Sequence, residues 1–200
     1  MRSTGAIILL VLFLLVGFAG CAGCGTYNSL VGSDVRVENA WADVETAYQR
    51  RADLIPNLVS TVQGAADFEQ ETLTAVTEAR TRAANIELSG DDLDNPARMQ
   101  EFMQAQNNLA AATGSLINLV REDYPELRAT ASFRDLQVQL EGTETRINTA
   151  RRDYNQAVAD YNRSVRTFPA NIVAGLTGFG QKTPFEADAG AEDAPEVSFE

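Results

Sequence analysis

The side chains that could do chemistry in this sequence are carboxylates, arginines and hydroxyls, because the chain has no histidine and only two cysteines. Both cysteines, Cys21 and Cys24, lie in an apolar N-terminal stretch. The rest of the chain therefore has no thiol or imidazole with which to bind zinc, form a disulfide or build a nucleophile and base pair. No spacing singles out two carboxylates for acid and base work. We expect neither an enzyme nor a cofactor.

The acidic segment SGDDLDNP comes nearest to a metal-binding motif. Its three aspartates, Asp91, Asp92 and Asp94, lack the alternating ligand spacing, the central glycine and the terminal glutamate of an EF-hand loop. The sequence therefore predicts no metal site.

The stretch YQRRADLIPNLV, residues 48–59, places charge inside an apolar pattern that is typical of an amphipathic helix. Arg51 occupies a position where the pattern calls for an apolar residue, and a buried arginine without a partner costs several kcal/mol. We expect Arg51 either to extend its charged end to water or to pair with a carboxylate, for which Glu78 on the next, antiparallel helix is the favoured candidate. Such a pair would fix the register of the helices. The alternative is that Arg51 docks a protein partner or an anionic headgroup.

The neighbours of Arg51 have simpler interpretations. Arg50 is free to face water, and Asp53 lies on another face of the same helix. Pro56 lacks a backbone donor and crowds the carbonyl of Ala52, so it predicts a kink that Asn57 is placed to bridge. The kink would curve the helix around its neighbours, and a ligand cleft at this point is the alternative.

Apolar residues at intervals of three and four predict four helices that carry these groups. The connections between them are short and the period is near 3.5, which favours an all-α, antiparallel four-helix bundle with long first and fourth helices and two shorter ones. In the last helix the predicted seam continues through Tyr154, Ala157, Tyr161, Ser164 and Phe168. The apolar segment NIVAGLTGFG at 171–180 is too short to cross a bilayer and should pack across one end as a short helix or loop. The four predicted helices are residues 33–64, 68–87, 96–122 and 132–168.

The N-terminal residues predict attachment to a membrane. Arg2 precedes an apolar block at 6–20 and the sequence GCAGCG. This pattern fits a lipoprotein signal with Cys21, or alternatively Cys24, as the lipidated residue, and it also fits a transmembrane anchor. Either way the remainder should lie outside the cytoplasm. The predicted division is a leader or anchor at 1–25, a helical domain at 26–180 and an acidic, disordered tail at 181–200.

The charge balance narrows the choice of partners. The chain has 28 acidic and 16 basic residues, for a net charge of −12, which argues against a nucleic-acid partner. A long helical surface without a catalytic motif predicts a scaffold or adaptor that presents its helices to other envelope proteins. The alternative is a carrier or sensor that binds a lipid or small apolar ligand between helices near Pro56. No oligomeric state is predicted.

Several ordered motifs resemble the LemA family of bacterial proteins. They are TYNSLV at 26–31, AWADVETAYQRRADLIPNLVSTVQGAADFEQETLTAVTEAR at 40–80, LEGTETRINTARRDYNQAVADYN at 140–162 and FPANIVAGLTGF at 168–179. The resemblance spans residues 27–185. It implies an all-α, four-helix domain held at a membrane by its N-terminus, with no established enzymatic activity. A related type of protein belongs to the magnetosome membrane of magnetotactic bacteria.

Overall fold

The computed structural model describes residues 2–64 and 69–186, and all regular structure in this part of the chain is helical. The all-α prediction is therefore confirmed. The elements in chain order are α1 (Arg2–Gln63), α2 (Gln70–Ala84), the 3-10 helix η1 (Gly90–Asp94), α3 (Pro96–Asp123), α4 (Pro125–Arg128), α5 (Ala131–Arg166) and α6 (Ala170–Thr177).

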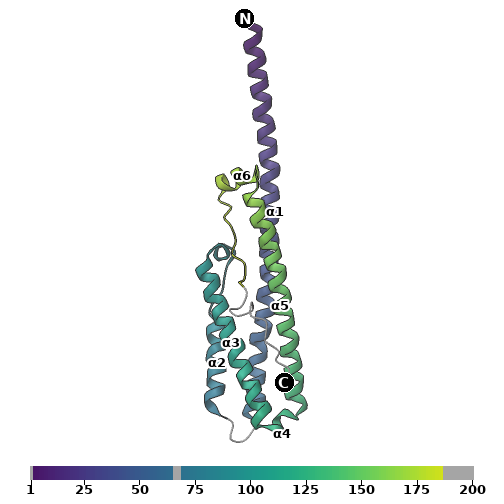
Figure 1. Ribbon diagram of the computed structural model, residues 1–200, viewed down its shortest axis with the longest axis vertical. Coiled ribbons are helices and arrows are strands. Elements are labelled where there is room, and N and C mark those ends of the chain that lie inside the picture. The colour runs from purple at the N-terminus through teal and green to yellow at the C-terminus, as the bar shows by residue number, and fades with distance from the viewer. Residues whose placement is uncertain (1, 65–68, 187–200) are drawn as a thin grey trace, which may run out of the picture.

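Helix α1 is much longer than the predicted helix at 33–64. It has 62 residues, which at 1.5 Å per residue extend over about 93 Å. The predicted leader from residue 2 onward and the first predicted helix thus belong to one continuous helix, and its first part projects alone beyond the other elements (Figure 1). Among the α1 residues whose burial the structure describes, Leu30 is the first that is buried. Among the described residues, no helix combines the length and apolar character needed for a membrane span.

The long helices pair in opposite directions. Helix α1 makes its most extensive contact with α5, and α2 packs mainly against α3 (Figure 1). The seam predicted for α5 is buried as far as Tyr154, but Val158 and Val165 then take the buried positions expected for Ala157 and Ser164. The reason is that an α-helix has 3.6 residues per turn and drifts away from a strict 3.5 repeat. Phe168 lies beyond the end of α5 and is 75% exposed.

The buried apolar residues form two clusters. One surrounds Trp41 and Tyr154 and takes its α1 residues from 30–48, and the other surrounds Leu58 and Phe133 and takes its α1 residues from 54–62. Arg51 is buried on α1 between the α1 residues of the two clusters, and Thr143 is buried between the corresponding residues of α5. A polar layer therefore separates the two apolar regions of the fold.

The segment after α6 is ordered, contrary to the predicted disorder from residue 181. Residues 180–186, here called the C-terminal strap, run in extended conformation along α5. Phe185 is 5% exposed, and its ring centroid lies 5.9 Å from that of Trp41 and 5.4 Å from that of Tyr154. Burial of this ring offsets the entropy lost when the strap is ordered. Residues 187–200, the rest of the predicted tail, lie outside the described residues.

Two asparagines hold the strap in the same way. Asn155 accepts a hydrogen bond from the Phe185 N–H at 2.8 Å and donates one to the Phe185 carbonyl at 3.0 Å. Asn162 makes the same pair of bonds with Lys182, at 2.9 and 2.8 Å. The asparagines are two helical turns apart, about 10.5 Å, and three residues of extended chain span about 10 Å. The match lets two identical clamps operate on one extended segment.

The strap also connects α5 to the rest of the fold. The Thr183 N–H donates to the Leu93 carbonyl of η1 at 2.7 Å, and the Tyr154 hydroxyl donates to the Thr183 carbonyl at 2.9 Å. Lys182 Nζ donates to the Gly90 carbonyl at 3.2 Å and lies 3.6 Å from Asp34 on α1. The strap therefore joins α1, η1 and α5.

Phe185→Ala should lower the free energy of unfolding by about 3 kcal/mol, because it empties a buried aromatic site. Phe168→Ala, at an exposed aromatic residue, is the matched control and should change it by less than about 0.5 kcal/mol. Urea unfolding of the full chain in detergent, followed by fluorescence of Trp41, the only tryptophan, checks both values. Equal stability of the two variants would show that the strap does not contribute to the core.

Candidate functional site

Arg51 is the centre of a polar junction that joins three helices. Its side chain is 3% exposed. Nη1 donates to Glu144 Oε1 on α5 at 3.1 Å, and Nη2 donates to the carbonyl and to Oε1 of Gln106 on α3 at 2.9 and 2.8 Å. The guanidinium also lies 5.0 Å from the ring centroid of Tyr48. These contacts compensate the buried charge, although Nε has no hydrogen-bond partner.

The predicted partner of Arg51 was wrong. Glu78 lies on an exposed face of α2 and forms an ion pair with Arg82 at 3.7 Å. Glu144 takes its place because α1 packs mainly on α5, whereas the prediction assumed pairing with the next helix in the sequence. The Glu144 side chain is 45% exposed, so its carboxylate keeps contact with water while it neutralises Arg51. The three bonds to α3 and α5 fit a role in register better than a docking role, which would require them to break.

Arg51→Met should destabilise the full chain by about 2 kcal/mol, because it leaves the buried Gln106 amide without its donor. Arg51→Lys should still cost about 1 kcal/mol, since one ammonium cannot reproduce the fork that serves both α3 and α5. The control is Arg50→Met at the exposed neighbouring position. Urea unfolding provides the measurement. An Arg51→Met protein of unchanged stability that has lost a binding partner would instead support docking at Arg51.

Pro56 lies inside α1 and the helix continues through it. Because proline has no N–H, the carbonyl of Ala52 lacks its usual partner within the helix. Arg80 on α2 supplies one, since its Nε donates to the Ala52 carbonyl at 2.9 Å. Pro56 and Asn57 are both exposed. The contact that compensates the proline thus comes from α2 and not from Asn57, whose own carbonyl accepts a hydrogen bond from Thr61.

A double-mutant cycle tests this compensation. Arg80→Met should destabilise the protein by about 1 to 2 kcal/mol, because a partly buried carbonyl loses its charged donor. In a Pro56→Ala background the restored N–H satisfies Ala52, so the same substitution should cost less than about 0.5 kcal/mol. Thermal unfolding of the four proteins gives the coupling. Equal costs in the two backgrounds would show that Arg80 does not compensate for Pro56.

An open groove of about 900 Å³ lies beside the junction, between α1, the end of α2 and the connection to α3. Its apolar lining includes Tyr48, Ile86 and Phe102. Among the described residues that line the groove, Arg50 alone is basic. Four carboxylates line it as well, contributed by Glu45, Asp53, Glu87 and Asp92. The lining of the groove thus contains both apolar side chains and an excess of negative charge.

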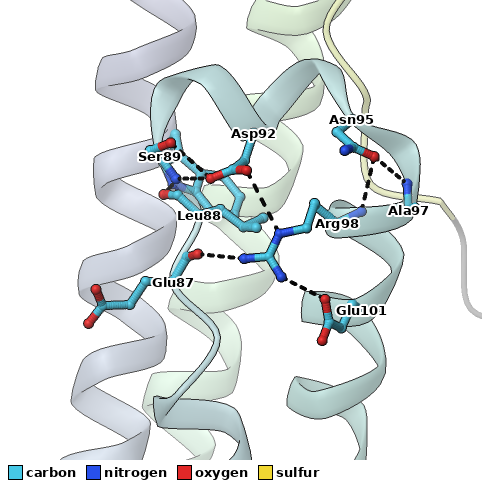
Figure 2. A network of polar contacts seen from close by, with 9 residues as sticks. Glu87, Leu88, Ser89, Asp92, Asn95, Ala97, Arg98 and Glu101 are labelled. Atoms are coloured by element: carbon cyan, nitrogen blue, oxygen red, sulfur yellow. Dashed lines mark hydrogen bonds and ion pairs between the residues drawn. The ribbon is translucent and has the colours of Figure 1, made fainter.

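Figure 2 shows a polar network in the connection between α2 and α3 and the start of α3. Four of its residues line the groove and are here called its rim: Glu87, Leu88, Ser89 and Asp92. Asp92 accepts hydrogen bonds from the N–H and the hydroxyl of Ser89, at 2.9 and 2.8 Å. Arg98 lies 3.7 Å from Asp92, donates to the Glu87 carbonyl at 3.2 Å and bonds Glu101 at 2.7 Å. The backbone hydrogen bond from Ser89, followed by its hydroxyl, lowers the pKa of Asp92. The ionised form of Asp92 is therefore favoured. Arg98 connects Asp92 and the Glu87 carbonyl to Glu101 at the start of α3.

The start of α3 lies next to this rim. Asn95 caps α3 by accepting hydrogen bonds from the N–H groups of Ala97 and Arg98 at 3.0 and 3.3 Å, and Pro96 occupies the first helical position (Figure 2). In the described part of the chain, no group of three histidine, cysteine or acidic residues is arranged to hold a metal ion.

Glu45 of α1 is affected by its surroundings and by the charge of Glu87, which lies in the connection between α2 and α3. Partial burial raises the pKa of Glu45, the side chain of Trp41 opposes the shift, and the negative charge of Glu87 adds to it. The ionised form of Glu45 is thus disfavoured where it stands. A cation placed between Glu45 and Glu87 would relieve this cost. The groove is therefore suited to a positively charged group.

The candidate residues from the sequence divide between the groove and other surfaces. Arg50 and Asp53 line it, and Arg51 lies next to it through Tyr48 and Gln106. Pro56, Asn57 and Glu78 do not line it. The Cys21 side chain lies outside the described residues, and Cys24 is an exposed free thiol.

The sequence did not identify the other members of the site. Gln106 carried a signal, a polar residue in an apolar seam, but Glu144, Glu45 and Glu87 look like ordinary surface charges. Only their placement by the fold distinguishes them.

The comparisons with known proteins agree with the motifs. A family model described as LemA family matches residues 40–199. Protein LemA of Metamycoplasma hominis is 25% identical over 83% of this chain and 71% of its own length. Magnetosome protein MamQ 2 of Paramagnetospirillum magneticum is 25% identical over 86% of this chain and 68% of its own, and Magnetosome protein MamQ of Magnetospirillum gryphiswaldense is 22% identical over the same shares.

Proposed function

This chain belongs to the LemA family, and from that membership we propose that it is a membrane-tethered scaffold of the bacterial envelope. In this proposal the four long helices form an antiparallel four-helix bundle. The N-terminal segment attaches the bundle to a membrane, through lipid on Cys21 or Cys24 or through the apolar block itself. The bundle lies on the extracytoplasmic side and binds another envelope protein.

The continuity of α1 supports the tether. The apolar block at 6–20 and the buried positions from Leu30 onward belong to one helix, so an attached N-terminus would hold the helical body directly. The positive residue Arg2 before the block favours an N-terminus that stays inside. Neither the family description nor the names of the relatives states an enzymatic activity.

The observation that carries the binding proposal is the groove beside Arg51. Its lining combines four carboxylates with apolar side chains, and its open volume is about 900 Å³. A polypeptide segment with lysine or arginine next to one or two apolar side chains matches this surface in charge and in polarity. Because the bonds of Asp92 and Arg98 fix the rim, such a segment would meet a preformed surface.

The alternative is a carrier or sensor for a lipid or small apolar ligand near Pro56. It has less support, because Pro56 and Asn57 are exposed and do not line the groove. The groove also has four carboxylates in its lining, whereas sites for small apolar ligands are mostly apolar.

Site-specific photo-crosslinking in the native cells tests the scaffold proposal. A photo-reactive amino acid replaces Gln49, which lines the groove, or Gln156, an exposed control residue on α5. The Gln49 position should yield a reproducible crosslink to an envelope protein, and the Gln156 position should not. Glu45→Gln with Glu87→Gln should remove most of the Gln49 product, because it neutralises two of the groove carboxylates.

Identical products from both positions would contradict docking in the groove. The absence of any product, together with a lipid that co-purifies with the full chain in native mass spectrometry, would favour the carrier alternative. Unchanged crosslinking in the doubly substituted protein would show that the groove carboxylates do not recognise the partner.

A further inference from the structure

An exposed apolar surface lies at the end of the helical body from which α1 projects. Phe168 is 75% exposed, and Ile172 and Leu176 on α6 are 54% and 82% exposed. On the same short helix Ala174 is 3% exposed and packs into the core. Residues 167–181 contain no charged side chain. Helix α6 therefore has apolar residues both toward the core and toward the outside.

Helix α6 is held at a defined level of α1. It lies across the end of the helical body, where the first part of α1 leaves it (Figure 1). Cys24 and Tyr27 of α1 form a pocket of about 480 Å³ with Val173 and Leu176. The ring centroids of Tyr27 and Phe179 are 5.8 Å apart. The exposed face of α6 is thus placed beside residues 23–28, directly after the apolar block of the sequence.

The charges around this end differ from those of the whole chain. The net charge is −12, yet no carboxylate occurs before Asp34 or between Asp160 and Glu186. Arg163 and Arg166 at the end of α5 lie next to α6 in the sequence and are exposed. Arg163 also pairs with Asp160 at 3.4 Å, whereas Arg166 has no ion pair among the described residues. A surface with exposed apolar and aromatic residues and nearby arginines suits a lipid headgroup region, where aromatic side chains are enriched and basic residues meet anionic lipids.

We propose that Phe168 and the outer face of α6 rest on the lipid surface to which the N-terminal segment is tethered. This inference rests on the proposed tether, but it holds whether the tether is a lipid or an apolar helix. An acyl chain on Cys24, or a membrane-embedded block at 6–20, would each place residues 23–28 at the headgroups. A second protein copy is a poorer occupant, because one face of an eight-residue helix is far smaller than the roughly 800 Å² per partner of a stable interface.

Lipid quenching of tryptophan fluorescence tests the contact in the full chain. Leu176→Trp and the control Val138→Trp, at a 67% exposed residue of α5, are reconstituted into phosphatidylcholine and phosphatidylglycerol vesicles with or without brominated acyl chains. Bromine quenches only at short range. The emission that the Leu176→Trp substitution adds to that of the parent protein should lose most of its intensity in brominated vesicles. The emission added by Val138→Trp, and that of the buried Trp41 in the parent protein, should stay unchanged.

Flotation of the same samples separates the two proposals. Protein that floats with the vesicles while the Leu176→Trp signal is not quenched would overturn the contact of α6 and leave the tether intact. Protein that does not float would overturn the tether and with it this inference. An unquenched signal that shifts to shorter wavelength as protein concentration rises would show that a second copy, and not lipid, covers α6.

Discussion

A buried guanidinium has to find its hydrogen-bond acceptors wherever the chain places it, and in this fold Arg51 finds them on two other helices at once. Its forked geometry requires Gln106 of α3 on one side and Glu144 of α5 on the other. Apolar side chains on either side of it would tolerate small sliding of α1, but three directed bonds do not. The same layer separates the two apolar clusters and adjoins the groove through Tyr48 and Gln106. The register of the helices and the shape of the groove therefore depend on one residue.

Local patterns in the sequence predict well where the helices lie, but they predict poorly which helices pack against one another. Pro96 and Pro125 mark the ends of α3, so this helix could be located from the sequence to within one residue. Periodicity also shows that Arg51 lies in an apolar seam. It does not show which helix covers that seam, because any apolar face satisfies it equally, and the predicted partner Glu78 was wrong for this reason. The groove could not be predicted at all, since Glu45 and Glu87 come together only after the α2 to α3 connection turns back on α1.

The C-terminal strap illustrates a second limit of the same kind. Asn155 and Asn162 read as polar residues of an amphipathic helix, and Phe185 stands alone among small and charged residues. Their significance lies in a match between the rise of a helix and that of an extended chain, which no local pattern contains. Composition near the C-terminus suggested disorder, yet one buried aromatic ring and two side-chain clamps suffice to order residues 180–186.

The uninterrupted course of α1 makes the helix a molecular ruler. Gln49 at the groove follows Cys24 by 25 residues, which corresponds to about 37 Å of helix. With no break in the helix between these points, the groove would stand at a fixed height above a bilayer surface at Cys24. A second protein of the same membrane would meet the groove only through a segment that reaches this height, whether as a stalk of its own or as a chain of about 11 extended residues. The distance of the groove from the bilayer would then limit which proteins can reach it, before the groove carboxylates select among them by charge.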